Sequence, residues 1–300
     1  MTDADCAACG GGPLSLRLRV GTPLDERGLI PTTDAYGQAL DDIVQCAACG
    51  HRQIAHKPSE VELLSLYVAA RADHYVHEEE GQRTTAHATL AQIERHVNTR
   101  GRLLDLGCWV GYLLAAARDR GWEVTGVEPS DFAADFARER LGLPIVQADL
   151  LTAELAPASF DAIVLGDVLE HLTDPLAALE HIATLLAPGG VLYLALPDAG
   201  SRLARLMGAR WWSVIPTHVQ YFSRASIAIL LRRAGYELLQ IRTEPKTFSV
   251  RYYLWRLSGY SQPLSDGLTR LMAAVGLADR LWTPDFRDRM GVVARGPQTP

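Results

Sequence analysis

Several features that would assign a chain to a common class of protein are missing from these 300 residues. No apolar run approaches the roughly 20 residues of a membrane helix, so we expect no transmembrane segment. The N-terminal residues lack both a basic start and an apolar core, so we expect no signal peptide and a cytoplasmic protein. A net charge of −6 gives no overall attraction to nucleic acid, and we expect no nucleic-acid partner.

Two signatures of enzyme classes are absent as well. A dinucleotide-binding turn has the glycine spacing G-x-G-x-x-G, whereas Gly107 and Gly111 of this chain are four residues apart. This spacing weakens the case for a nicotinamide-dependent reductase. No nucleophilic triad is visible in the sequence either.

Cysteine is scarce, but its placement is informative. Four of the five cysteines make two copies of the pentapeptide Cys-Ala-Ala-Cys-Gly, at Cys6, Cys9, Cys46 and Cys49. Two such turns supply the four thiolates that a tetrahedral zinc ion prefers, and they leave no open position for catalysis. Two disulfides would need an oxidising compartment, and a redox pair would not need a duplicate. We therefore predict a structural zinc ion in a zinc-ribbon-like module at residues 1–57.

The central feature of the chain is an apolar strand-like run that breaks into a glycine turn. The run contains Asp105, and the turn contains Gly107, Cys108 and Gly111 before a predicted helix at 113–120. In an open α/β sheet, such a turn brings backbone amides and a helix N-terminus against a ligand at the carboxyl edge of the strands. The sequence therefore predicts a nucleotide-type binding turn.

An acidic residue follows the next predicted strand, at 122–127. Glu128 stands at the end of this strand, 23 residues after Asp105. An acid in this place can accept hydrogen bonds from both ribose hydroxyls of a bound nucleotide. The alternative role, N-cap of the helix predicted at 130–141, is served equally well by Ser130. We therefore expect Glu128 to bind ligand.

The rest of the chain continues the alternation of strands and helices. Further strands are predicted at 143–150, 159–165, 191–196, 236–243 and 290–295. Helices are predicted after Asp174-Pro175 and after Ser223, which are residues that begin helices. This alternation predicts an α/β fold.

These motifs together resemble class I S-adenosylmethionine (SAM)-dependent methyltransferases. The segment Asp-x-Gly-x-x-x-Gly at 105–111 resembles their motif I, and the strand at 159–165, Leu-Glu-His, the Asp-Pro helix and Pro-Gly-Gly follow in the expected order. The resemblance covers about residues 100 to 245. It implies a Rossmann-like sheet of seven mostly parallel strands, with helices on both faces and the last strand antiparallel. Trp109 departs from the family pattern, because it replaces the middle glycine of motif I.

The resemblance also implies which residues bind SAM. Asp149 would meet the adenine amino group, and Leu150 would offer a backbone amide or apolar cover. The full expected set is Asp105, Gly107, Cys108, Gly111, Glu128, Asp149, Leu150 and Asp167.

The cysteine pairs ahead of this core match a bacterial subgroup of such methyltransferases. That resemblance implies a small-molecule acceptor, with a hydroxyl of a sugar, polysaccharide precursor or secondary metabolite as the expected methylation site. O-methylation is expected ahead of N- or C-methylation. The alternative is a zinc-ribbon partner-binding protein whose core is non-catalytic because Trp109 blocks the pocket.

Three residues are candidates for acid–base chemistry. His218 can take a proton from a hydroxyl near neutral pH, Tyr221 can hydrogen-bond the acceptor, and His171 lies in the Leu-Glu-His segment. His218 could instead cap the following helix. The spacing of Asp167, Glu170 and His171 resembles a divalent-metal site of ubiquinone-biosynthesis O-methyltransferases, although Leu-Glu-His also shapes the SAM-pocket rim in metal-free relatives.

The sequence also predicts how the chain is divided. A helical connector is expected at 58–98 and the methyltransferase domain at 99–300, with an insertion at about 245–288. The insertion is rich in aromatic residues and arginine. Packing onto the core is expected for it ahead of a substrate lid, a homodimer face or a membrane-surface contact.

Overall fold

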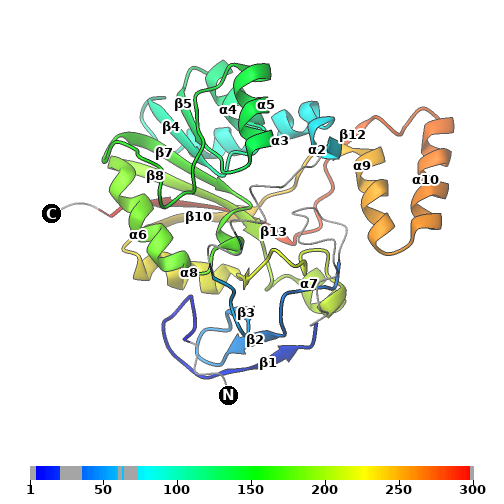
Figure 1. Cartoon of the computed structure of the whole chain (residues 1–300), viewed down its shortest axis with the longest axis horizontal. Helices are drawn as coiled ribbons and strands as arrows, with labels where there is room; N and C mark the ends of the chain where they lie inside the picture. The colour runs from blue at the N-terminus through cyan, green and yellow to red at the C-terminus, as the bar shows by residue number, and fades with distance from the viewer. Residues whose placement is uncertain (1–4, 21–35, 60–62, 64–72, 298–300) are drawn as a thin grey trace.

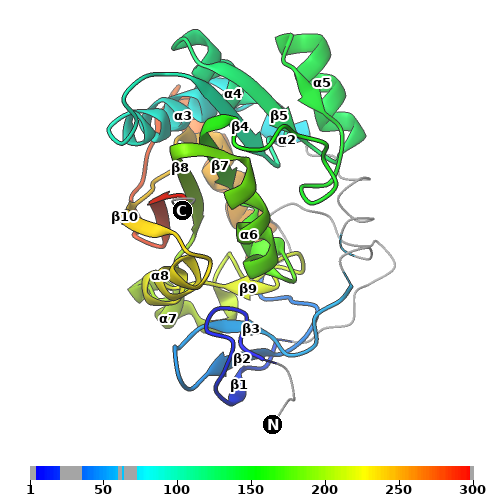
Figure 2. The ribbon, with the colours of Figure 1, turned by 90° about the vertical axis from the view of Figure 1, so that its left-hand side faces the viewer.

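A seven-stranded sheet forms the centre of the protein (Figures 1 and 2). The computed structural model describes residues 5–20, 36–59, 63 and 73–297. The strand order in the sheet is β10-β13-β8-β7-β4-β5-β6. Strands β4 to β8 pair in parallel, and β13 is antiparallel to both β8 and β10, as the sequence predicts. The strands are β4 (Arg102–Leu106), β5 (Glu123–Val127), β6 (Ile145–Val146), β7 (Phe160–Gly166), β8 (Leu186–Pro197), β10 (Glu237–Thr243) and β13 (Arg289–Arg295).

Helices cover both faces of this sheet, which explains why its central strands are almost wholly apolar. Side chains of a strand alternate between the two faces. Leu192 and Leu194 of β8 therefore pack with the helices α6 and α8, while Val191 and Tyr193 pack with the other core. The first face carries α6 (Pro175–Leu185) and α8 (Arg224–Arg233), and the second carries α3 (Glu79–Ile93), α4 (Tyr112–Asp119) and α5 (Asp131–Leu141).

Side-chain caps fix where α5, α6 and α8 begin. The Ser130 hydroxyl accepts a hydrogen bond from the Ala133 amide, and the Asp174 carboxylate accepts one from the Ala177 amide. Ser223 and Ser226 form a reciprocal capping box at α8. Because Ser130 caps α5, Glu128 is not needed for that role.

A second, smaller sheet has the order β1-β2-β3-β9, and Cys46 ends its strand β2, while the other three cysteines lie outside its strands. Strands β1 (Leu14–Leu18), β2 (Ile43–Cys46) and β3 (Arg52–Ile54) come from the N-terminal module, but β9 (Gln220–Tyr221) comes from the segment before α8. Gln53 of β3 pairs with Gln220 of β9. The module is therefore joined to the large domain by backbone pairing as well as by side-chain packing.

The structure differs from the predicted elements at two strands. The strand predicted at 143–150 shortens to the two residues of β6, and β8 begins at Leu186, before the start predicted at residue 191. A short helix, α2 (Asp73–Val76), precedes α3, and most of the predicted connector before it lies outside the described residues.

The chain between β10 and β13 forms a helical hairpin that projects from one side of the sheet (Figure 1). None of the described helices is long and apolar enough to cross a membrane. The hairpin and its flanking strands are β11 (Phe248–Ser249), α9 (Val250–Trp255), η3 (Arg256–Gly259), α10 (Gln262–Ala274) and β12 (Leu281–Trp282); the remaining short helices are η1 (Leu169–His171), α7 (Arg202–Met207) and η2 (Gly208–Arg210).

Candidate active site

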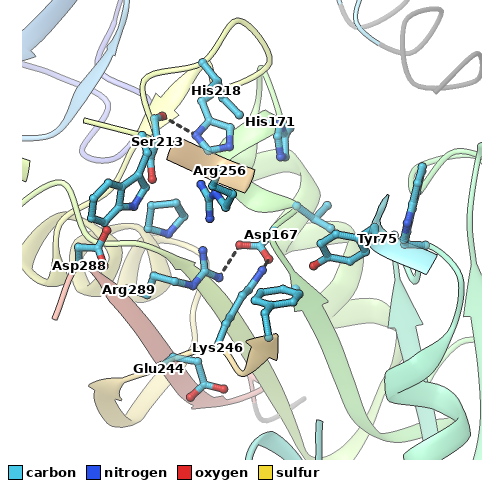
Figure 3. Close-up of a pocket in the computed structure, with 18 of the residues that line it drawn as sticks. Tyr75, Asp167, His171, Ser213, His218, Glu244, Lys246, Arg256, Asp288 and Arg289 are labelled. Atoms are coloured by element: carbon cyan, nitrogen blue, oxygen red, sulfur yellow. Dashed lines mark hydrogen bonds and ion pairs between the residues drawn. The ribbon is translucent and has the colours of Figure 1, made fainter. Parts of the chain in front are cut away.

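A cavity of about 1350 Å³ opens at the carboxyl edge of the parallel strands (Figure 3). Ligands of open α/β sheets bind at this edge. One side of the cavity is lined by the loops that follow β4, β5, β6 and β7, and the other by β11, α9, η3 and β12. Seven of the predicted site residues line it, namely Gly107, Glu128, Asp149, Leu150, Asp167, His171 and His218.

Two backbone amides hold the Glu128 carboxylate at this edge. One carboxylate oxygen accepts a hydrogen bond from the Trp109 amide at 2.7 Å, and the other accepts one from the Ser130 amide at 2.9 Å. Burial raises the pKa of Glu128 to about 7, and the two amides act against this rise. Glu128 can therefore change its charge close to neutral pH.

The loop after β6 supplies the neighbouring wall. Asp149 and Leu150 both line the cavity, and the Asp149 carboxylate accepts a hydrogen bond from the Leu151 amide at 2.8 Å. Leu150 is buried, so it offers an apolar surface. An acid beside an apolar side chain suits the amino edge and the flat face of a purine.

Three of the residues predicted to bind SAM do not line the cavity: Asp105, Cys108 and Gly111. Asp105 is buried inside the sheet, and burial together with the neighbouring Glu128 raises its pKa to about 7. The Cys108 amide donates to the Val127 carbonyl. These two residues therefore lie behind the cavity wall.

Gly111 is explained by packing rather than by a ligand. Its φ of 81° favours glycine, and a Cβ atom there would lie 2.6 Å from Leu143 and 3.2 Å from Ala137. Gly111 therefore allows the start of α4 to approach α5 and the chain that follows it. Gly107 also has a positive φ, of 74°, but it borders the cavity.

Trp109 occupies the glycine turn with a φ of 49°. This left-handed conformation is uncommon for a bulky residue and is the kind that favours glycine. The backbone at this position thus has a glycine-like conformation although the residue is tryptophan. The indole lines the cavity, and its ring centroid lies 6.4 Å from that of Phe132. The tryptophan therefore forms part of the cavity wall.

A charged cluster surrounds Asp167 on the far side of the cavity (Figure 3). The Asp167 carboxylate accepts hydrogen bonds from Lys246 and Arg289. Burial opposes ionisation, but the two cations hold the pKa of Asp167 well below its ordinary value. No sequence motif indicates a role for Lys246 or Arg289, which lie more than 75 residues from Asp167 in the chain.

Two histidines lie together in the cavity. The rings of His171 and His218 are 4.7 Å apart, and their Nδ1 atoms lie 2.8 Å from the carbonyl oxygens of Thr217 and Ser213. Because a carbonyl only accepts, each Nδ1 carries a hydrogen, and Nε2 is the basic atom of each neutral ring. Burial lowers the pKa of both rings, to about 4 for His171, so both are neutral at pH 7.

Glu170 lies beside these rings, and neither of its carboxylate oxygens has a hydrogen-bond partner among the described residues. Burial and the charge of Asp167 raise its pKa to about 8. Ligand atoms of Glu170, His171 and His218 lie within 4.8 Å of one another, and Asp167 is not part of this group. The three residues whose spacing resembles a divalent-cation site, Asp167, Glu170 and His171, thus belong to two separate clusters.

Tyr221 lies away from the cavity. It is buried in the apolar core between the N-terminal module and the segment before α8, and no residue that the structure describes forms a hydrogen bond with its hydroxyl. Its ring centroid is 6.4 Å from that of His218. Pairing of β9 with β3 turns Tyr221 into this core, so the structure gives its hydroxyl no contact with an acceptor in the cavity.

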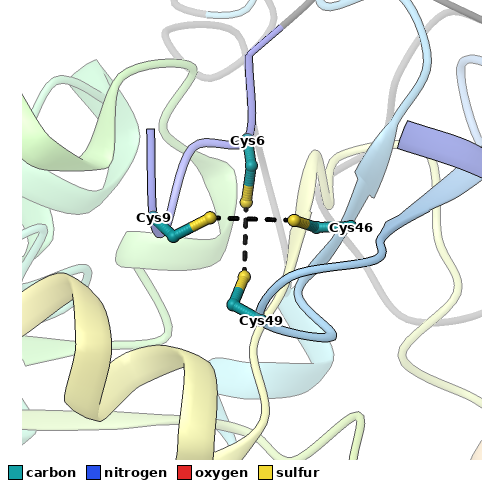
Figure 4. A group of neighbouring side chains, drawn as sticks. All are labelled: Cys6, Cys9, Cys46 and Cys49. Atoms are coloured by element: carbon teal, nitrogen blue, oxygen red, sulfur yellow. Dashed lines mark hydrogen bonds between the residues drawn. The ribbon is translucent and has the colours of Figure 1, made fainter. Parts of the chain in front are cut away.

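The four N-terminal cysteines converge in space (Figure 4). The sulfur atoms of Cys6 and Cys49 are 3.5 Å apart, and those of Cys9 and Cys46 are 3.7 Å apart. Tetrahedral zinc with bonds of about 2.3 Å needs sulfur–sulfur distances of about 3.8 Å. The cluster therefore fits a four-thiolate zinc site.

Parts of this chain are similar in sequence to known proteins. A ubiquinone biosynthesis O-methyltransferase from Stutzerimonas stutzeri is 34% identical over 34% of this chain and 47% of its own length. A protein of the same name from Chromobacterium violaceum is 29% identical over 48% of this chain and 68% of its own length. The first alignment thus spans about half of that relative.

A chain of the complex that contains the Haloferax volcanii Trm112 methyltransferase activator has the same fold. It is 18% identical and aligns with a TM-score of 0.52 over 76% of this chain and 96% of its own length. A family described as "Methyltransferase domain" matches residues 75–241, more than half of the sequence. With its Rossmann-like sheet of seven strands, this chain belongs to the methyltransferase-domain family.

Proposed function

We propose that this protein binds SAM and methylates a hydroxyl group of a small molecule. One observation carries the proposal: a single cavity joins the predicted nucleotide-binding acids Glu128 and Asp149 to the basic imidazole of His218. The names of the O-methyltransferase relatives support a small-molecule hydroxyl as the acceptor.

The residues around Glu128 fit the adenosine part of SAM. The carboxylate is positioned by two amides and can accept hydrogen bonds from the ribose hydroxyls. Asp149 would accept from the adenine amino group, and Leu150 would cover the ring. A Cβ atom on Gly107 would lie 2.6 Å from Val168, so this turn keeps its shape only with glycine.

His218 would act as the general base. Its Nδ1–H donates to the Ser213 carbonyl, which leaves Nε2 to accept the proton of the acceptor hydroxyl. Bound SAM supplies a methyl group that is already activated by its positive sulfur. The protein therefore needs mainly to align the acceptor and to remove its proton.

The acceptor is a secondary metabolite in this proposal, ahead of a sugar or a polysaccharide precursor. The chain has six tryptophans, ten tyrosines and six phenylalanines, and eleven of these aromatic residues line the cavity. Such walls favour a flat or apolar molecule.

The cysteine cluster would hold one structural zinc ion through Cys6, Cys9, Cys46 and Cys49. Four thiolates complete the tetrahedral shell, so the ion would stabilise the module and take no part in methyl transfer. The thiolates call for a reducing compartment, and we propose the cytoplasm.

Labelled methyl transfer tests the proposed function. Pure protein would be incubated with methyl-labelled SAM and a fractionated extract of its own host, and label should appear in a small hydroxylated product. His218→Asn should reduce the rate about 100-fold or more while SAM affinity stays unchanged, because only the base is lost. A His218→Asn variant with full activity would rule out this base.

A further inference from the structure

The acceptor side of the cavity is built mainly outside the matched family region of residues 75–241. Its walls come from the insertion, which contributes the aromatic residues Phe248, Tyr252, Tyr253, Trp255, Tyr260 and Trp282. This part of the chain therefore determines what kind of acceptor fits.

Arg256 is a cation of this insertion that lines the cavity (Figure 3). Its Nε donates a hydrogen bond to the Tyr36 hydroxyl at 2.9 Å, and its guanidinium carbon lies 5.7 Å from the centre of the Tyr36 ring. Tyr36 in turn stacks on Tyr260 with ring centroids 5.0 Å apart. The two tyrosines hold the guanidinium in place but supply no negative charge.

The nearby acids are already engaged by other groups. Asp167 accepts from Lys246 and Arg289, Asp288 accepts from the Trp211 indole, and Glu244 accepts from Thr89 and Gln92. Among the described residues, no carboxylate lies within ion-pair distance of Arg256. The N–H groups of its two terminal nitrogens can thus donate hydrogen bonds to a ligand in the cavity.

A cation that is partly buried among aromatic side chains is less costly when a counter-charge accompanies it. A guanidinium with free terminal nitrogens matches two oxygens of a carboxylate or a phosphate. Lys246 and Arg289 differ from Arg256, because both form ion pairs with Asp167.

We propose that Arg256 binds an anionic group of the acceptor, either a carboxylate or a phosphate. The acceptor is then an aromatic hydroxyl compound that carries this anion, with its ring against the aromatic walls and its hydroxyl directed to His218. This inference rests on the proposed function for the identity of the reacting group, but the anion site itself can be tested without SAM.

Three naphthalene probes separate the contributions of ring and charge. 2-Naphthol is neutral at pH 7, 3-hydroxy-2-naphthoate adds a carboxylate, and 2-naphthyl phosphate adds a phosphate. Their affinities would be measured by calorimetry on the full chain, without SAM and again with S-adenosylhomocysteine. Wild-type protein should bind one of the two anions about tenfold or more tightly than 2-naphthol, and the preferred anion identifies the group.

Two variants assign this preference to Arg256. Arg256→Gln should bind all three probes with similar affinity and should keep its affinity for SAM. Arg251→Gln is the matched control, because Arg251 lies on the same hairpin, pairs with Asp279 and does not line this cavity, and it should keep the preference.

Two results would overturn the inference: wild-type protein that does not prefer either anion to 2-naphthol, or a preference that survives in Arg256→Gln. If Arg256→Gln does not fold, the wild-type comparison still decides the first point, and Arg256→Lys, which keeps the charge, should show a reduced preference. Wild-type protein that prefers an anion but binds no SAM would remove the proposed function and leave the anion site standing.

Discussion

Glu128 connects the glycine turn to the start of α5, because its carboxylate accepts from the amides of Trp109 and Ser130. The same carboxylate lines the cavity. A ligand with two adjacent hydroxyl groups can therefore be held by a group whose position the backbone already fixes.

Glu128→Ala should weaken SAM binding by about 1–3 kcal/mol, which is the usual range for leaving buried hydrogen-bond partners unmet. Calorimetric titration of both proteins with SAM measures this difference. Glu123→Ala is a suitable control, because Glu123 is exposed at the opposite end of β5. Equal affinities in Glu128→Ala and wild-type protein would show that the acid has been misassigned.

SAM affinity should also depend on pH through Glu128. Its raised pKa of about 7 means that the group is mostly protonated at pH 6 and mostly ionised at pH 8. The ionised form accepts hydrogen bonds more strongly, so SAM binding should strengthen as pH rises from 6 to 8. Glu128→Gln should remove most of this dependence, and a Glu128→Gln profile identical to that of wild-type protein would contradict the assignment.

Trp109 combines a bulky side chain with a positive φ of 49°. Trp109→Gly and Trp109→Ala both remove the indole, but only glycine relieves the backbone strain. Trp109→Gly should therefore be about 1 kcal/mol more stable than Trp109→Ala in chemical unfolding.

Both Trp109 variants should keep their affinity for SAM, while their use of the acceptor should fall because the cavity loses part of its wall. A wild-type protein blind to SAM, together with a Trp109→Gly variant that gains binding, would instead support the partner-binding alternative.

At the scale of elements, β9 links the cysteine module to the candidate base. Its first residue, Gln220, lies two positions after His218 and pairs with β3, and the Gln220 amide oxygen lies 3.0 Å from Nε2 of His51. The predicted boundary at residue 57 stays a prediction, and this sheet crosses it. A structural change in the cysteine module should therefore displace His218 more than it displaces Glu128.

Cys46→Ser should lower the zinc content of the protein from about one ion per chain and reduce methyl transfer more than it reduces SAM affinity. Metal analysis, calorimetry with SAM and the rate of labelled methyl transfer provide the three measurements. Cys108→Ser is the control, because Cys108 lies apart from the cluster and should leave zinc content unchanged. Zinc-free wild-type protein, purified without chelator, would exclude the zinc site.

Local patterns predicted most of the sheet, because its strands are apolar runs between strong helix signals such as Ser130 and Asp174-Pro175. They were less successful where burial depends on distant partners. The strand expected at 143–150 has only two paired residues, in β6 at the edge of the sheet. Gly111 has the expected sequence position for ligand binding, but the packing of α4 against α5 explains it.

Across the whole molecule, the sequence located the cavity residues that follow the parallel strands better than those of the opposite wall. Glu128 and Asp149 follow strands directly, so their place at the sheet edge can be predicted from local order. Lys246, Arg256 and Arg289 meet Asp167 and Tyr36 only through long-range folding. Tyr221 likewise lies in the core because β9 pairs with β3, which no local pattern indicates.

The most direct test of the account is a calorimetric titration of the full-length protein with SAM. Wild-type protein should bind one SAM per chain saturably, and this binding should be weakened by Glu128→Ala and unaffected by Arg256→Gln. Wild-type protein that is folded by circular dichroism but binds no SAM would contradict the central claim.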